Sequence, residues 1–226
     1  MKTIKWTDSA QADEIEQTVA EVLIGGGLAC LPCGGKYRLL ADLGNVDAVM
    51  HLMQSKGRVR RAPALVFIDR EDQLGAVAEE VDPVALRLAR ALWPQPLTIR
   101  VRPNPELPSK VLKQLGGSKS RIGVRIPADP FIRALLAKVD RPLLVSSANK
   151  EAKAGDGSPA QVRKSFSAHV DLFVDRGDLA PEPPSTVVEV QEGNAVVERA
   201  GAVSAEAIEQ AARLEIAQGV GEDGEA

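Results

Sequence analysis

Residues 129–149 read DPFIRALLAKVDRPLLVSSAN, and this stretch decides the fold class. Asp129 followed by Pro130 is typical of a helix that starts with a capping carboxylate and a proline at its first position. The apolar side chains that follow recur at helical spacing: Phe131, Leu135 and Leu136. The apolar run Leu143–Ser146 then predicts a buried strand. A helix followed closely by a buried strand indicates an α/β protein.

The same alternation continues on both sides of this stretch. Further helix starts are marked by capping residues: Asp8 with Gln11, Asn45, and Asp82 with Pro83. Further runs with strand character are Leu28–Leu31, Ala64–Ile68, Leu97–Val101, Ile122–Ile126, Leu172–Val174, Thr186–Val190 and Ala195–Glu198. Several connections are longer than a hairpin turn, so we expect a single-domain α/β fold, a twisted mixed sheet with packed helices. We expect this domain over residues 1–203, a C-terminal helix over 204–217 and an acidic, disordered tail over 218–226.

Composition limits the class of protein. The 226 residues include 28 Lys and Arg against 31 Asp and Glu, and 44% of them are hydrophobic, which is typical of a globular chain. The two cysteines exclude a disulfide scaffold, and because His51 and His169 are the only histidines we expect no protein metal site. No apolar run reaches the length of a membrane span, and the N-terminus lacks the apolar core of a secretory signal. We therefore expect a cytoplasmic protein with no membrane contact.

Three short motifs lack the context that their usual function needs. Residues 219–224 match the glycine pattern of dinucleotide-binding proteins, but no predicted strand precedes them. Gly34-Gly35-Lys36 resembles the end of a phosphate loop without its first glycine. Cys30 and Cys33 have the spacing of a redox dithiol, but Cys30 lies inside a predicted strand and not at a helix start. We expect a buried cysteine with no redox role there.

Six blocks carry more information together than any of them does alone. In chain order they are Lys56-Gly57-Arg58, WPQPLT at 93–98, GVRIP at 123–127, SSAN at 146–149, STVV at 185–188 and Arg199-Ala200-Gly201. Their order and spacing resemble those of the YrdC/Sua5 family, the threonylcarbamoyl-AMP synthases of tRNA modification. The resemblance covers residues from about 23 to 201. It implies a single YrdC-like domain, of the short form of the family, with an open cationic cavity.

The resemblance also implies an activity. In that family the cavity binds ATP with Mg²⁺, bicarbonate and L-threonine, and the products are threonylcarbamoyl-AMP and pyrophosphate. The product then goes to a downstream threonylcarbamoyl transferase for the t6A modification of adenosine 37 in tRNA. Such a nucleotidyltransferase brings two anions together, a carbamate and the α-phosphate, and this calls for fixed cations. The basic segments 56–61 and 100–125 are consistent with that demand, although basic stretches also form solvated faces.

Candidate site residues follow from the matched blocks. The catalytic candidates are Lys56 and Arg58. The nucleotide-binding candidates are Arg58, Ser147, Asn149, Ser158 and Arg199. The amino-acid-binding candidates are Tyr37, Arg125 and Ser185. Each has a structural alternative, because the arginines could lie on the surface, Ser147 and Asn149 could cap a turn, and Tyr37 could pack in the core.

One block departs from the family pattern. Where the family has Pro-Thr-x-Thr-x-Tyr-Gly-Leu, residues 32–39 read PCGGKYRL, so both threonines are replaced. Three alternatives stay open: a divergent synthase, a paralogue that uses a different amine, and a non-catalytic member that binds tRNA or double-stranded RNA through its basic cavity. For an active enzyme the loss of the threonine hydroxyls predicts weaker selectivity for threonine, with serine or a more acidic amine tolerated.

Overall fold

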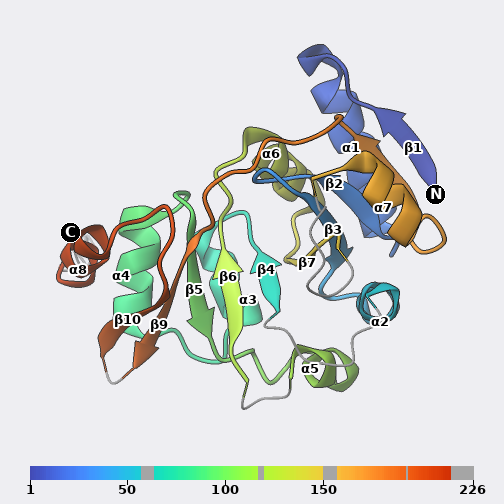
Figure 1. Cartoon of the computed structure of the whole chain (residues 1–226). Coiled ribbons are helices and arrows are strands. Elements are labelled where there is room, and N and C mark those ends of the chain that lie inside the picture. Colours follow the sequence, from blue (N-terminus) through green and yellow to red (C-terminus); the bar gives the residue numbers. More distant parts are fainter. Residues whose placement is uncertain (57–63, 117–119, 150–156, 192, 215–226) are drawn as a thin grey trace, which may run out of the picture.

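The computed structural model describes residues 1–56, 64–116, 120–149, 157–191 and 193–214, and Figure 1 shows their arrangement. The described strands form one mixed sheet of ten in the order β1-β8-β2-β3-β7-β4-β6-β5-β9-β10. Their bounds are β1 Lys2–Lys5, β2 Ala29–Pro32, β3 Tyr37–Asp42, β4 Leu65–Phe67, β5 Leu97–Val101, β6 Ile122–Arg125, β7 Leu143–Ser147, β8 Leu172–Asp175, β9 Thr186–Gln191 and β10 Asn194–Arg199. The predicted single-domain α/β fold with a mixed sheet is confirmed.

Three of the described helices, α2, α4 and α6, begin directly after the predicted capping residues Asn45, Asp82 and Asp129. They are α1 Ala12–Ile24, α2 Val46–Ser55, α3 Leu74–Val77, α4 Pro83–Leu92, α5 Ser109–Leu115, α6 Pro130–Val139, α7 Pro159–Phe166 and α8 Ala205–Ala212. The Asn45 side chain accepts from the amide of Ala48 at 3.0 Å, and the Asp129 carboxylate accepts from the amide of Phe131 at 3.0 Å. Asp8 and Gln11 form the predicted capping box at the short 3₁₀ turn before α1. No described helix is long and apolar enough to cross a membrane.

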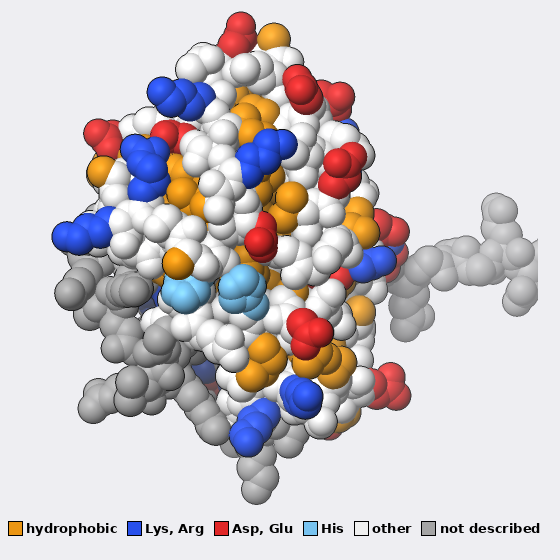
Figure 2. Space-filling model, turned by 90° about the vertical axis from the view of Figure 1, so that its right-hand side faces the viewer, with side chains coloured by type: hydrophobic (Ala, Val, Ile, Leu, Met, Phe, Trp, Pro, Cys, Tyr) orange, Lys and Arg blue, Asp and Glu red, His pale blue; other side chains and the backbone are white. Residues whose placement is uncertain are grey.

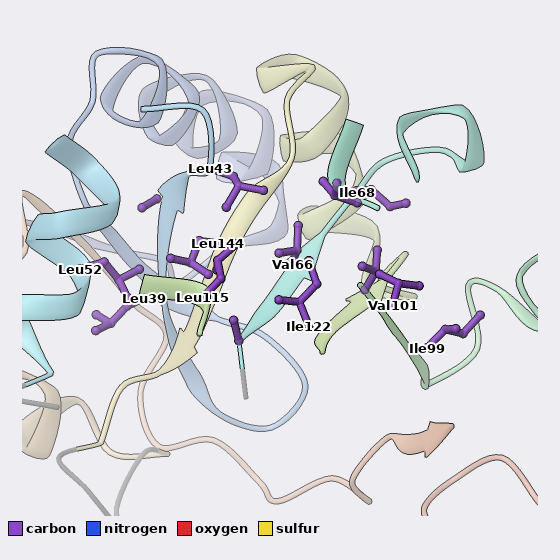
Figure 3. Close-up of a cluster of buried hydrophobic side chains, with 14 of the residues drawn as sticks. Leu39, Leu43, Leu52, Val66, Ile68, Ile99, Val101, Leu115, Ile122 and Leu144 are labelled. Carbon is purple, nitrogen blue, oxygen red and sulfur yellow. The ribbon is translucent and has the colours of Figure 1, made fainter. Parts of the chain in front are cut away.

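Successive side chains of the central strands point to opposite faces of the sheet, and each face carries its own hydrophobic cluster. In β7, for example, Leu144 belongs to one cluster, whereas Leu143 and Val145 belong to the other. Figure 3 shows part of the first cluster, where Leu39 and Val66 of the sheet meet residues of α2 and α5. The first cluster also takes buried residues of α4, α7 and α8.

The second face is covered only in part. Helices α1 and α6 pack against each other and against β2, β3, β7 and β8. Among the described residues, β5, β6, β9 and β10 contribute no side chain to this second cluster. One half of the sheet therefore presents a face that none of the described helices covers, and Thr98, Arg100 and Arg125 lie on it.

Two strands were not predicted. Residues 32–39 were interpreted as a loop, whereas β2 and β3 form an antiparallel hairpin that pairs Pro32 with Tyr37. Gly34 and Gly35 have φ values of 62° and 66°, and the amide of Cys33 donates to the carbonyl of Lys36 at 2.8 Å. This is the two-residue hairpin turn that needs positive φ at both central positions. The other missed strand is β1, which pairs with β8 at one end of the sheet.

The C-terminal helix lies on the same core. Ser204 caps α8, and Ile208 and Ala211 are buried in the first cluster against α4. The helix ends at Ala212, earlier than the expected residue 217. Residues 215–217 and the acidic segment 218–226 lie outside the described residues.

Candidate functional site

A cavity of about 720 Å³ lies over the uncovered half of the sheet. Its floor consists of side chains from neighbouring strands that share one face: Arg38, Leu65, Thr98, Arg100, Arg125, Ser147 and Val187. Gly123 belongs to this floor, because a Cβ there would approach the side chain of Thr98 to 2.6 Å. Residues 178–185, called the strap below, form one wall, and Glu198 and Arg199 at the end of β10 form another.

Arg125 is the most unusual residue of this lining. Its Nε is buried with no hydrogen-bond partner, and its guanidinium carbon lies 5.8 Å from the centre of the Phe67 ring. Burial lowers the pKa of the guanidinium, since little in the surroundings replaces the water that a cation loses. A desolvated cation that faces a cavity without a partner is a strong candidate for binding an anion.

Arg199 and Ser185 lie together at one wall of the cavity. The Arg199 guanidinium donates to the carbonyl of Ser185 at 2.8 Å and to its hydroxyl at 3.2 Å. That hydroxyl also lies 3.1 Å from the hydroxyl of Thr98 on the floor. The arginine is exposed, so its remaining donors are accessible to a ligand. The structure thus brings two of the predicted residues into contact.

Two other arginines near the cavity are neutralised. Arg100 forms an ion pair of 2.8 Å with Glu198, and Arg121 forms one of 2.8 Å with Glu189. Although partial desolvation acts to raise it, the nearby arginines hold the pKa of Glu198 below its usual value. The free positive charge of the floor therefore lies toward Arg38 and Arg125.

Lys56, Ser147 and Asn149 form a second group at the end of β7. The ammonium of Lys56 donates to the carbonyl of Ser147 at 2.7 Å, to the carbonyl of Asn149, and to Oδ1 of Asn149 at 3.3 Å. The Ser147 hydroxyl donates to the same Oδ1 at 2.7 Å. Lys56 is buried, so it fixes the turn that follows β7 and holds Ser147 against the cavity.

Four of the described candidates do not line the cavity, namely Lys56, Asn149, Tyr37 and Ser158. Tyr37 is fully buried, and its hydroxyl donates to the carbonyl of Gly177 at 2.7 Å and accepts from the amide of Arg176 at 2.9 Å. The Tyr37 side chain thereby anchors the chain where it enters the strap. Ser158 is the residue before α7, and Arg58 lies outside the described residues. The functional roles of all the candidate site residues stay predictions.

The hairpin turn and the strap touch each other. A Cβ on Gly35 would come within 2.6 Å of the carbonyl oxygen of Ala180 and of the amide nitrogen of Glu182. A Cβ on Gly201 would come within 2.3 Å of the carbonyl oxygen of Pro184. The strap therefore packs directly against the backbone of Gly35 and of Gly201. Lys36 and Arg38, which follow the hairpin turn, line the cavity.

The cysteines and histidines lie apart from this chemistry. Cys30 belongs to one core cluster and Cys33 to the other, and burial raises the pKa of both thiols. The two imidazoles sit side by side on the surface in Figure 2, with ring centres 6.4 Å apart, and neither lines the cavity. The described residues contain no group of three His, Cys, Asp or Glu side chains that could hold a metal ion.

The list of candidate site residues left out several residues that line the cavity, namely Arg38, Thr98, Arg100, Glu182 and Glu198. For β5 a signal was present, because Thr98 and Arg100 alternate with the buried Leu97, Ile99 and Val101. Two polar residues at that spacing on a strand inside the protein indicate a face toward water or a ligand. Glu182 lies in a proline-rich segment and offered no comparable pattern.

Comparisons with known proteins identify the family of this chain. The family model for Sua5, YciO and YrdC, described as Telomere recombination, matches residues 21–201. A threonylcarbamoyl-AMP synthase of Pyrococcus abyssi is 30% identical over 185 residues, which cover 82% of this chain and 53% of the relative, so the chain spans about half the length of that relative. The crystal structure of P. abyssi Sua5 complexed with L-threonine matches with a TM-score of 0.76 at 26% identity, over 93% of this chain and 60% of that one. E. coli YciO shares the fold, with a TM-score of 0.73 at 23% identity over 92% of this chain and 98% of that one. The chain therefore belongs to the Sua5/YciO/YrdC family.

Proposed function

We propose that this protein makes threonylcarbamoyl-AMP and pyrophosphate from L-threonine, bicarbonate and ATP. Its P. abyssi relative is named a threonylcarbamoyl-AMP synthase, which supports this product. The observation that carries the proposal is the unpartnered Arg125 guanidinium in a cavity that also presents Arg38, Ser185 and Arg199. These groups suit a carboxylate at one end and phosphates at the other.

The reaction needs charge neutralisation at two points. The amine of the amino acid takes up carbon dioxide derived from bicarbonate and loses a proton, which gives a carbamate. A carbamate oxygen then attacks the α-phosphorus of ATP, and the bond to the β-phosphate oxygen breaks to release pyrophosphate. In this proposal Arg199, which has accessible donors beside Ser185, binds the phosphates, and Arg125 binds the carboxylate of the amino acid.

Mg²⁺ enters this proposal with the nucleotide. The carboxylates in the lining are Glu182 and Glu198, and Glu198 is paired with Arg100. The ion would therefore take most of its ligands from phosphate and water, which is its usual preference, and it would offset part of the phosphate charge.

Lys56 supports the site through the chain. Its three donors are directed to oxygens of Ser147 and Asn149, so it holds the end of β7 in place for the nucleotide. Arg58, two residues further on, is assigned to the triphosphate by sequence alone. The downstream transferase and the modification of tRNA complete the proposed role.

The RNA-binding alternative has less support from the described residues. Arg121 was one of the basic residues that would suit a nucleic-acid surface, but it is paired with Glu189. Arg100 is paired as well, and Glu182 and Glu198 interrupt the positive lining. A surface that binds RNA by phosphate contacts would be expected to leave such cations free.

The test is pyrophosphate release with ATP and bicarbonate, with threonine, serine and aspartate supplied one at a time. We expect release that depends on the amino acid, and its loss in Arg125→Ala. Arg102→Ala serves as a matched control, because Arg102 is an exposed arginine of the same segment outside the cavity. Salt-sensitive binding of tRNA without any amino-acid-dependent pyrophosphate would refute the synthase and favour the binding protein. Activity with serine or aspartate alone would favour the paralogue that uses a different amine.

A further inference from the structure

Glu182 is a carboxylate of the strap that has no ion pair. It lines the cavity, and among the described residues its side chain has neither a hydrogen bond nor a salt bridge. The strap is fixed beneath it, because the amide of Glu182 lies against Gly35. Glu182 thus adds an exposed carboxylate without an ion pair to this lining, whereas the other carboxylate there, Glu198, is paired with Arg100.

Opposite charges lie close to this carboxylate without neutralising it. The Cβ position of Gly34 is 3.9 Å from Oε2 of Glu182 and 4.0 Å from Nη2 of Arg38. Neither side chain forms a salt bridge with the other, although both face this one point. The charge of Glu182 also reaches Arg125, where it opposes the effect of burial on the pKa of the guanidinium.

We propose that Glu182 is a specificity-determining residue that receives the α-amino group of the substrate while Arg38 and Arg125 hold its α-carboxylate. An α-amino acid carries a positive and a negative group a few ångströms apart, which matches an unpaired carboxylate beside unpaired guanidinium groups. This inference rests on the proposed function, because it assigns the amino acid to this cavity.

The arrangement also explains selection by charge. A neutral amino acid satisfies Glu182 with its ammonium and adds no further charge. An acidic side chain brings a second carboxylate toward Glu182, and two like charges that lie close together repel each other. Glu182 therefore favours neutral amino acids. This differs from the sequence-based expectation that a more acidic amine would be tolerated as a substrate.

The experiment compares ligands with and without the amino group. Calorimetric titration at pH 7 measures the Kd of threonine, of aspartate and of 2,3-dihydroxybutyrate, in which a hydroxyl replaces the amine of threonine. The proteins are the wild type, Glu182→Gln, and Glu106→Gln as a control, since Glu106 is an exposed glutamate that lines a different hollow. For Glu182→Gln we expect about tenfold weaker threonine binding, corresponding to about 1.4 kcal/mol, and a change of less than about twofold for the hydroxy acid. Aspartate should bind the variant better relative to threonine.

Three outcomes would overturn the inference. They are unchanged threonine binding in Glu182→Gln, an equal loss for threonine and the hydroxy acid, and the same loss in Glu106→Gln. Failure of the proposed function is read separately, from the absence of pyrophosphate release by the wild type with any amino acid. If the wild type binds threonine and releases pyrophosphate, and Glu182→Gln behaves identically, the proposed synthase activity is retained and the proposed role of Glu182 is refuted. If the wild type binds no amino acid, both the proposed function and the proposed role of Glu182 are refuted.

Discussion

Substitution of Gly35 by alanine tests the contact between the hairpin turn and the strap, and the neighbouring glycine supplies the control. Gly34 and Gly35 both have positive φ, 62° and 66°, so alanine at either position costs about 1 kcal/mol from the left-handed backbone. The surroundings differ. At Gly34 the nearest atom to a Cβ lies at 3.9 Å, whereas at Gly35 two backbone atoms of the strap lie at 2.6 Å.

Because the clashing atoms belong to the backbone, the strap has to move. We expect Gly34→Ala to lower the free energy of unfolding by about 1 kcal/mol, and Gly35→Ala to lower it by a further 1 to 3 kcal/mol, roughly. Urea denaturation followed by circular dichroism measures both values. Gly35→Ala should also weaken threonine binding, since the strap carries Glu182. Equal destabilisation by the two variants would refute the contact between turn and strap.

Three further predictions concern single side chains. Arg125→Met should abolish amino-acid binding while the free energy of unfolding stays the same or rises by about 1 kcal/mol. The reason is that the substitution removes a buried cation whose Nε has no hydrogen-bond partner. A clear loss of stability in chemical denaturation would contradict this prediction. Tyr37→Phe should cost about 1 to 3 kcal/mol, since the carbonyl of Gly177 and the amide of Arg176 lose their partner. Burial raises the pKa of Tyr37 from its ordinary value of 10.0 to about 12, so the wild type should lose stability as the pH rises through this range and the Phe variant should lose less, as thermal melts at several pH values can show. Arg58→Ala should lose roughly 2 to 4 kcal/mol of transition-state stabilisation in kcat/KM, with Arg58→Lys recovering only part; unchanged pyrophosphate release would remove Arg58 from the mechanism.

The parts of the fold that could be predicted are those fixed by local chemistry. Asn45 and Asp129 cap their helices through bonds to amides two or three residues away, so the sequence nearby contains the whole signal. Buried runs such as Leu143–Ser146 were equally visible, because this strand opens with three apolar residues that are buried on both faces of the sheet. Strand β3 was not predicted because Gly34-Gly35 was interpreted as part of an altered binding loop. A pair of glycines is also a typical sequence for a two-residue hairpin turn.

The candidate site was less predictable because its contacts join distant segments. The bonds of Lys56 to Ser147 and Asn149 span 91 and 93 residues, and only the family resemblance placed the three together. The hydroxyl of Tyr37 finds its partners 139 and 140 residues away. Nothing near Tyr37 in the sequence distinguishes an aromatic residue that touches a ligand from one that anchors the strap.

The altered block at residues 32–39 and the position of the strap depend on each other. The family's second threonine corresponds to Gly35, and in this fold a side chain at that position would collide with Ala180 and Glu182. The strap can lie where it does only because glycine stands there, and its position brings the carboxylate of Glu182 within 3.9 Å of the Cβ position of Gly34. The hydroxyl groups that the hairpin lacks are thus replaced at the cavity by an anion from another segment. On this argument restoring threonine at position 35 alone would displace the strap and weaken binding. Recovery of the family's selectivity would require changing the strap together with the turn.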